Sequence, residues 1–183
     1  ATPEATNYLG PHDRKVAIAE PLDGPTVGRY RALASELGIT LLLGSVNERA
    51  EDEGRCYNTS VLIGPDGAMI DSYRKMHLFD VDASERLRFF ESSTTVPGER
   101  VVVADSPVGR IGMSICYDLR FPELYRAMLD AGAQILMVPS AFTLTTGKDH
   151  WHPLLRARAI ETQCYVIAPG QHGHHDDKGL RES

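Results

Sequence analysis

Apolar residues recur at two spacings in the first quarter of the chain, and each spacing predicts a different element. In residues 24–38 they recur every three or four positions, and Gly38 follows as a natural C-terminal stop. This pattern predicts an amphipathic helix. Residues 39–46 form a short, nearly continuous apolar run, which is typical of a strand buried on both faces. A helix that leads directly into a buried strand indicates an α/β protein.

Two pairs of apolar segments further along the chain are each separated by a turn sequence. The first pair flanks Gly-Pro-Asp-Gly at 64–67, and the second pair flanks Ser-Pro-Val-Gly at 106–109. Glycine and proline at these positions are typical of the tight turns that join antiparallel strands. We therefore expect one hairpin that ends at Lys75 and a second hairpin that ends at Cys116.

The last third of the chain alternates helical and strand patterns. We expect helices at 123–132 and 149–163, and buried strands at 133–141 and 164–170. In the second helix Asp149 is a plausible N-cap, and Pro153 is tolerated in or near the first turn. The order of elements predicts mixed β-sheets covered by helices.

A single domain over residues 1–183 is the expected organisation, because a chain of 183 residues can bury one sizeable core. Hydrophobic residues make up 42% of the chain and charged residues 24%, which is typical of a folded globular protein and not of a disordered one. Both ends are polar and show no closing strand or helix. We therefore expect the sequence to be a fragment of a longer domain, truncated at both ends.

Net charge, hydropathy and cysteine content indicate which partners and which compartment to expect. The net charge is −6 without a stripe of basic residues, which argues against a nucleic-acid partner. No apolar run reaches the roughly 18 residues that a membrane helix needs, and no secretory leader opens the chain. The cysteines Cys56, Cys116 and Cys164 are odd in number and far apart, which does not suit a disulfide framework. We expect a cytoplasmic protein with no membrane partner.

Cys116 lies where an apolar strand pattern gives way to a charged segment containing Pro122. A residue on a tight strand-to-helix turn can project from the sheet beside a free backbone N–H. Free cysteine is also among the most buried residue types, so packing is the alternative role. A nucleophilic thiol needs a base and a donor for the substrate oxyanion. Lys75 ends the first hairpin and Cys116 ends the second. Both side chains can therefore reach the same edge of the fold, where the strands end.

The segment YRKMHLFD around Lys75 and the segment CYDLRFPEL around Cys116 resemble the nitrilase superfamily of carbon–nitrogen hydrolases. The stretch HWHPLLRARAIETQCYVIAPGQ at 150–171 is similar to a helix–strand segment of the same group, and the resemblance runs from about residue 2 to about residue 175. It implies a four-layer α-β-β-α sandwich with two mixed β-sheets, here incomplete at both termini. It also implies a homodimer or higher homo-oligomer of the full-length protein.

The resemblance also implies a Glu-Lys-Cys triad. PEAT at the start of the chain resembles the segment that bears the general-base glutamate, which implies Glu4, and FFES resembles the segment of a further active-site glutamate, which implies Glu91. Lys75 and the backbone N–H of Tyr117 would stabilise the oxyanion formed when Cys116 attacks a primary amide. Glu91 would hold Lys75 charged and oriented.

Other residues of the second motif have structural roles in this interpretation. We expect Arg120 and Glu123 to form an ion pair that shapes the turn, and we expect Asp118 to be structural. No cofactor or metal is needed. The stretches AFTLTTGKDHW and LLRARAIETQCYV look closest to the branch of deaminated glutathione amidase and omega-amidase, which implies a short ω-amide as the small-molecule substrate. The alternative within this branch is an omega-amidase acting on α-ketoglutaramate.

Three alternatives from other functional classes remain open. The first is a non-catalytic binding or assembly module of the same fold. The second is a cysteine–histidine hydrolase that uses His77 as its base. The third is a metal-dependent hydrolase built on the histidines of the C-terminal tract, which are His172, His174 and His175.

Overall fold

The computed structural model describes residues 1–11, 14–52, 54–84 and 87–175. Within these residues the helices are α1 (Pro25–Leu37), α2 (Pro122–Asp130) and α3 (Leu144–Thr162), with short 3₁₀ helices η2 (Glu91–Ser93) and η3 (Cys116–Arg120). The strands are β1 (Leu41–Arg49), β2 (Cys56–Ile63), β3 (Met69–Arg74), β4 (Asp80–Ser84), β5 (Leu87–Phe90), β6 (Val103–Ser106), β7 (Gly109–Met113), β8 (Ile135–Met137) and β9 (Tyr165–Ile167).

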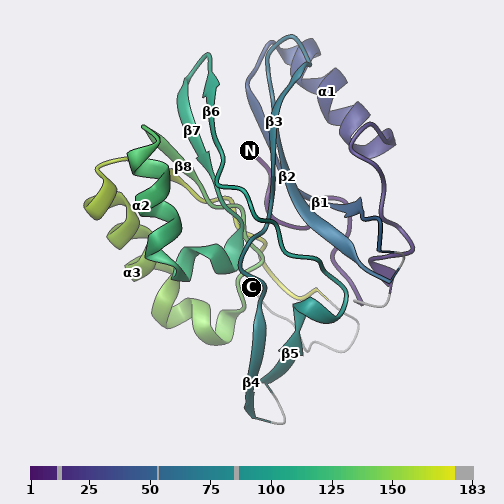
Figure 1. Ribbon diagram of the computed structural model, residues 1–183, viewed down its shortest axis with the longest axis vertical. Coiled ribbons are helices and arrows are strands. Elements are labelled where there is room, and N and C mark those ends of the chain that lie inside the picture. The colour runs from purple at the N-terminus through teal and green to yellow at the C-terminus, as the bar shows by residue number, and fades with distance from the viewer. Residues whose placement is uncertain (12–13, 53, 85–86, 176–183) are drawn as a thin grey trace.

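The described strands form two facing sheets and one short hairpin. The first sheet has the order β1-β2-β3 and is antiparallel, and β4 pairs with β5 alone. The second sheet has the order β6-β7-β8-β9 and is mixed, because β6 and β7 are antiparallel whereas β7, β8 and β9 are parallel. Helix α1 covers the outer face of the first sheet, and α2 and α3 cover the outer face of the second (Figure 1). The expected α-β-β-α layering is confirmed.

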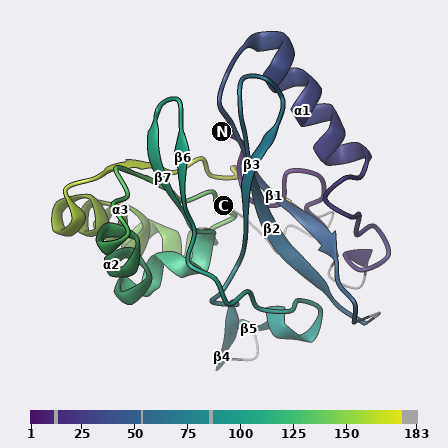
Figure 2. The ribbon, with the colours of Figure 1, turned by 45° about the horizontal axis from the view of Figure 1, so that its top comes forward.

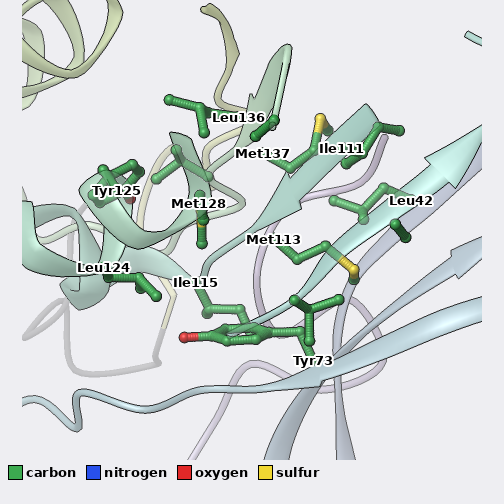
Figure 3. Close-up of a cluster of buried hydrophobic side chains, with 14 of the residues drawn as sticks. Leu42, Tyr73, Ile111, Met113, Ile115, Leu124, Tyr125, Met128, Leu136 and Met137 are labelled. Carbon is green, nitrogen blue, oxygen red and sulfur yellow. The ribbon is translucent and has the colours of Figure 1, made fainter. Parts of the chain in front are cut away.

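Alternation along the strands divides the apolar side chains between two cores. Side chains of successive strand residues point to opposite faces. Leu43 on β1 therefore packs toward α1, while its neighbour Leu42 packs between the sheets. Tyr73 from β3 lies in the same inter-sheet core as Met113 and Ile115 from the second sheet (Figure 3). This core brings the ends of β3 and β7 close together.

The N-terminal segment enters between the two sheets (Figure 2). The backbone N–H of Thr2 donates to the carbonyl of Leu42 at 3.0 Å, which attaches the segment to β1. None of the helices in the ranges given above is long and apolar enough to cross a membrane.

Both predicted hairpins are present. The first ends at Arg74, one residue before Lys75, and its turn includes Gly67 with φ 76°. The second is shorter than expected, because β7 ends at Met113. Beyond that point the backbone N–H groups of Ser114 and Cys116 still donate to the carbonyls of Met137 and Pro139, at 3.1 and 2.9 Å, along the line of β8. The chain turns at the cysteine itself, whose φ is 49°.

Two expectations about the elements were wrong. Helix α3 begins at Leu144, so Asp149 is not its N-cap and Pro153 lies inside the helix. The first turn is closed by the N–H of Gly147 donating to the carbonyl of Thr143 at 2.7 Å, in a stretch whose threonines and glycine have low helix propensity. The β4–β5 hairpin was also not expected. Only Asp80 of β4 and the last two residues of β5 lie in segments that were interpreted, and these were interpreted as motifs.

Candidate active site

The Glu4 segment reaches the interior because β1 leaves room for it. Gly44 lies opposite the segment, and a Cβ there would meet the carbonyl oxygens of Thr2 and Pro3. Ala5 has φ 58°, in the left-handed region that non-glycine residues rarely adopt, so the chain turns sharply directly after Glu4. The result is a carboxylate held between the sheets, with Glu4 only 6% exposed.

Lys75 follows β3 and joins two carboxylates. Its Nζ donates to Oε1 of Glu4 at 3.0 Å and to Oε2 of Glu91 at 2.9 Å, and the residue is 2% exposed. The Nδ2 of Asn58 on β2 bridges the same two carboxylates, at 2.9 Å from Glu4 and 3.3 Å from Glu91. One ammonium and one amide thus bind both acids in a buried network.

Cys116 opens η3 with φ 49°, a conformation that holds the residue at a sharp turn between β7 and the helical turn. The carboxylate of Glu4 faces its thiol closely enough to raise the pKa of that thiol. One oxygen of that carboxylate, Oε2, accepts the backbone N–H of Ala141 at 2.8 Å. The N–H of Tyr117 lies in the first turn of η3, where helical N–H groups have no partner within the helix.

The structure therefore brings four predicted residues together, namely Glu4, Lys75, Glu91 and Cys116, and it places Tyr117 directly after the thiol. They come from four separate segments, namely the N-terminal segment, the residue after β3, η2 and η3. The arrangement can supply a base, a nucleophile and two oxyanion donors to one small volume.

The two acids hold Lys75 in its charged form. Burial alone would lower the pKa of the ammonium, but the charges of Glu4 and Glu91 outweigh it and raise the pKa well above 10.5. Burial would likewise raise the pKa of Glu91, whereas Lys75 and Lys15 lower it to about 2. Both members of the pair are thus ionised at neutral pH.

The thiol of Cys116 is neutral in the resting protein. Burial is the largest cause and the charge of Glu4 the second, and together they raise its pKa well above 9.0 although Lys75 acts in the opposite direction. A thiol of this kind cannot supply a standing thiolate. It can react only if a base takes its proton, and Glu4 is the carboxylate that faces it.

Two residues of the site were missed by the sequence analysis. Asn58 had a usable signal, because an amide in the otherwise apolar stretch 57–63 needs a buried partner. Lys15 had none. It is partly buried, and burial lowers its pKa although the charges of Glu91 and Glu4 act in the opposite direction. This second ammonium was not predictable from the turn-rich segment that carries it.

The alternative base and the expected ion pair have other partners. His77 faces Asp118, with Nδ1 at 2.7 Å from Oδ1, and its ring stacks on Phe121.

Arg120 does not pair with Glu123 in the part of the chain that the structure describes. Its Nη1 lies 3.2 Å from Nδ1 of His150. It also lies over the rings of Tyr117 and Phe142. The expectation of an Arg120–Glu123 pair was wrong, because the guanidinium points to this aromatic group.

The C-terminal histidine tract is only partly described. Residues 172–175 lie within the structure, whereas Asp176 and Asp177 lie outside the described residues. Among the residues that are described, no three histidine, cysteine, aspartate or glutamate side chains gather into a group that could hold a metal ion.

Comparison with known proteins places the whole stretch in one group. The carbon-nitrogen hydrolase family model matches residues 1–181. The deaminated glutathione amidase of Dictyostelium discoideum is 51% identical over 165 residues, covering 87% of this chain and 57% of that protein. The deaminated glutathione amidase of Rattus norvegicus is 45% identical over 180 residues, covering 96% of this chain and 55% of that protein. The chain thus spans little more than half the length of these relatives.

Solved structures agree with this grouping. The Caenorhabditis elegans NitFhit protein matches with a TM-score of 0.90 and 42% identity, covering 100% of this chain and 44% of that one. Saccharomyces cerevisiae Nit3, a member of branch 10 of the nitrilase superfamily, matches with a TM-score of 0.84 and 33% identity, covering 99% and 64%. An amidase from Nesterenkonia sp., in a glutamate-to-glutamine mutant with acrylamide added at the active-site cysteine, matches with a TM-score of 0.77 and 26% identity, covering 94% and 65%.

Proposed function

The chain belongs to the carbon–nitrogen hydrolase family, and we propose that its full-length protein hydrolyses a small primary amide to an acid and ammonia. The observation that carries this proposal is that a neutral buried thiol faces a carboxylate that is itself bonded to an ammonium. Cys116, Glu4 and Lys75 supply these three groups. A buried scaffold has no need for such an arrangement, because each buried charge is costly to desolvate.

In the first half of the reaction Glu4 takes the proton from Cys116 as the sulfur attacks the amide carbon. A C–S bond forms, and the carbonyl π electrons move onto oxygen. Lys75 and the N–H of Tyr117 stabilise that oxyanion. The C–N bond then breaks as the oxyanion collapses, Glu4 returns the proton to the leaving nitrogen, and ammonia departs from a thioester on Cys116.

In the second half water replaces ammonia. Glu4 accepts a proton from water as its oxygen attacks the thioester carbon, and the same donors stabilise the second oxyanion. The C–S bond breaks, the proton returns to sulfur, and the acid leaves. A single positioned base contributes about 10²- to 10⁴-fold in rate and one oxyanion donor about 10²- to 10³-fold.

For the substrate we propose deaminated glutathione or a similar ω-amide, with α-ketoglutaramate as the alternative. The deaminated glutathione amidases of Dictyostelium discoideum and Rattus norvegicus support the first choice. Such substrates carry carboxylates, which an arginine can bind. Arg120 suits this role because it lies four residues after the nucleophile and has no acidic partner among the described residues.

We also propose a homo-oligomer in the cytoplasm. Ile160 on α3 and Tyr165 on β9 are 76% and 80% exposed, so their side chains are available to a second copy or to the rest of the full-length chain. All three cysteines are free and buried, which suits a reducing compartment. Light scattering of the full-length protein on a sizing column will give its oligomeric state.

The test is mass spectrometry of the full-length protein mixed with deaminated glutathione, α-ketoglutaramate and other ω-amides. We expect an acyl adduct on Cys116 and release of ammonia. Cys164→Ser is the matched control, because Cys164 is as buried as Cys116, at 8% exposure, and its thiol donates to the carbonyl of Ala133. Cys164→Ser should retain turnover, and Cys116→Ser should lose it.

The outcomes separate the competing functions. Absence of both adduct and ammonia with every amide would contradict the substrate class. If Cys116→Ser then left ligand binding and assembly unchanged, a non-catalytic module would be favoured. Activity that survives Glu4→Gln and is lost in His77→Phe would favour a cysteine–histidine hydrolase.

A further inference from the structure

We propose that Asp118 is a positioning residue that holds the ammonium of Lys75 and the thiol of Cys116 in register by joining the end of β3 to η3. This inference rests on the proposed function for its meaning but on separate contacts for its support. Asp118 is fully buried, at 0% exposure, and lies two residues after the nucleophile.

The carboxylate of Asp118 accepts four hydrogen bonds from two segments. Its Oδ2 accepts the hydroxyl of Tyr73 at 2.7 Å and the backbone N–H of Ile115 at 2.8 Å. Its Oδ1 accepts the backbone N–H of His77 at 3.0 Å and lies 2.7 Å from Nδ1 of the same residue. Every donor is thus a neighbour of one of the two reacting side chains.

The positions of these donors in the sequence connect Asp118 to both Lys75 and Cys116. Lys75 lies between Tyr73 and His77, and Cys116 lies between Ile115 and Asp118. The hydroxyl of Tyr73 also accepts the N–H of Met76 at 3.3 Å, so the residues on either side of Lys75 are held. A shift of either segment would break bonds to the same carboxylate.

Hydrogen bonding within one sheet cannot fix the position of Lys75 relative to Cys116. Strand β3 belongs to the first sheet and β7, which leads to η3, belongs to the second. Figure 3 shows Tyr73 beside Ile115 in the core between the sheets, where apolar packing alone would allow sliding. Hydrogen bonds to one buried carboxylate are directional and fix the distance.

The test measures the effect of Tyr73→Phe and His77→Phe in the full-length protein, because replacement of the buried Asp118 risks the fold itself. Each variant removes one donor to Asp118, and phenylalanine at position 77 keeps a ring to stack on Phe121. We expect kcat on the ω-amide to fall by about 10- to 100-fold with little change in KM, because a displacement of about 1 Å at reacting groups can cost 10²-fold.

A second measurement needs no substrate. The rate of Cys116 alkylation by iodoacetamide as a function of pH reports the charges that face the thiol, which are Glu4 and Lys75. Movement of Lys75 away from the thiol should shift this profile to higher pH in both variants. Tyr125→Phe is the matched control, because Tyr125 is fully buried and its hydroxyl contacts Ser114 at 2.8 Å. It should leave the profile unchanged.

The two proposals fail in different ways. An unchanged kcat and an unchanged alkylation profile in both variants would overturn the positioning role, and so would an equal change in Tyr125→Phe. If the unmodified protein hydrolyses no amide while Tyr73→Phe still shifts the alkylation profile, the proposed function fails and the positioning role of Asp118 stands.

Discussion

Glu4 has two opposing effects on Cys116, and they can be separated in one variant. As the proposed base it would make the thiol reactive toward an amide, whereas its charge raises the pKa of the thiol. Glu4→Gln should therefore lower kcat by about 10²- to 10⁴-fold. The same variant should form a thiolate at lower pH, because Lys75 still faces the sulfur.

The measurement is amide turnover together with the pH profile of Cys116 alkylation. Glu48→Gln is the control, because Glu48 is also a buried carboxylate but bonds to Thr59 and Arg74. An alkylation profile that stays in place or moves to higher pH in Glu4→Gln would show that Glu4 does not control the thiol.

The lowered pKa of Glu91 makes the free energy of unfolding depend on pH in the acid range. Its pKa is about 2 in the folded protein and 4.5 ordinarily, so the folded state binds fewer protons between these values. Its contribution to the free energy of unfolding is complete above about pH 4.5 and is lost as the pH falls toward 2. Glu91→Gln should therefore have a flatter stability profile in this range.

Urea unfolding at several pH values between about 3 and 6 will measure this slope. Asp105→Asn is the control, because Asp105 forms an exposed pair with Arg110, and exposed pairs contribute little. Equal slopes in Glu91→Gln and in the unmodified protein would contradict the assignment of acid sensitivity to Glu91.

At the scale of elements, the close approach of β1 and the N-terminal segment positions Glu4, the proposed base. A Cβ at Gly44 would meet backbone carbonyl oxygens that have little freedom to move. Gly44→Ala should displace Glu4, lower kcat and reduce the free energy of unfolding by about 1–3 kcal/mol.

Gly28→Ala provides the comparison for Gly44→Ala. A Cβ at Gly28, within α1, would meet no atom, so alanine should stabilise the helix by about 0.5–1 kcal/mol and leave turnover unchanged. Urea unfolding and amide turnover of both variants are the measurements. Full activity in Gly44→Ala would show that the approach of the N-terminal segment to β1 does not position the base.

The sequence predicted elements well where one local pattern decides, and poorly where distant contacts decide. Helix α1 ends at Gly38 with φ 62° as expected, because glycine adopts this conformation at low cost. The first residues of α3 lie in a polar stretch with no helical pattern of its own. The sequence therefore could not predict that the helix begins at Leu144. The β4–β5 strands are too short to show a clear alternation.

The site residues were also predictable where a local motif identifies them, and not where contacts between distant segments decide. Glu4, Lys75, Glu91 and Cys116 were named from local segments that resemble a known superfamily, and the structure brings their side chains together. The electrostatic interaction of Lys15 with this charge network depends on where the fold places Lys15, which no short motif encodes. The role inferred for Asp118 likewise needs both sheets in place, because its partners are up to 45 positions away in sequence.

At the scale of the whole molecule, the site exists only where the two sheets face each other. Leu62 on β2 lies in the inter-sheet core, whereas Leu43 on β1 packs toward α1, and both are almost fully buried, at 1% and 0% exposure. Leu→Val at either position removes similar packing and should reduce the free energy of unfolding by about 1 kcal/mol.

Only the Leu62 variant should also reduce turnover, because relaxation of the inter-sheet core changes the distance between Lys75 on one side and Cys116 on the other. Leu43→Val relaxes the layer between α1 and the first sheet, which contains none of the proposed catalytic residues. The measurement is kcat at a temperature where urea unfolding shows both variants fully folded. A proportional loss of kcat in both would mean that activity follows overall stability, and that the sheet-to-sheet distance has no separate control over the chemistry.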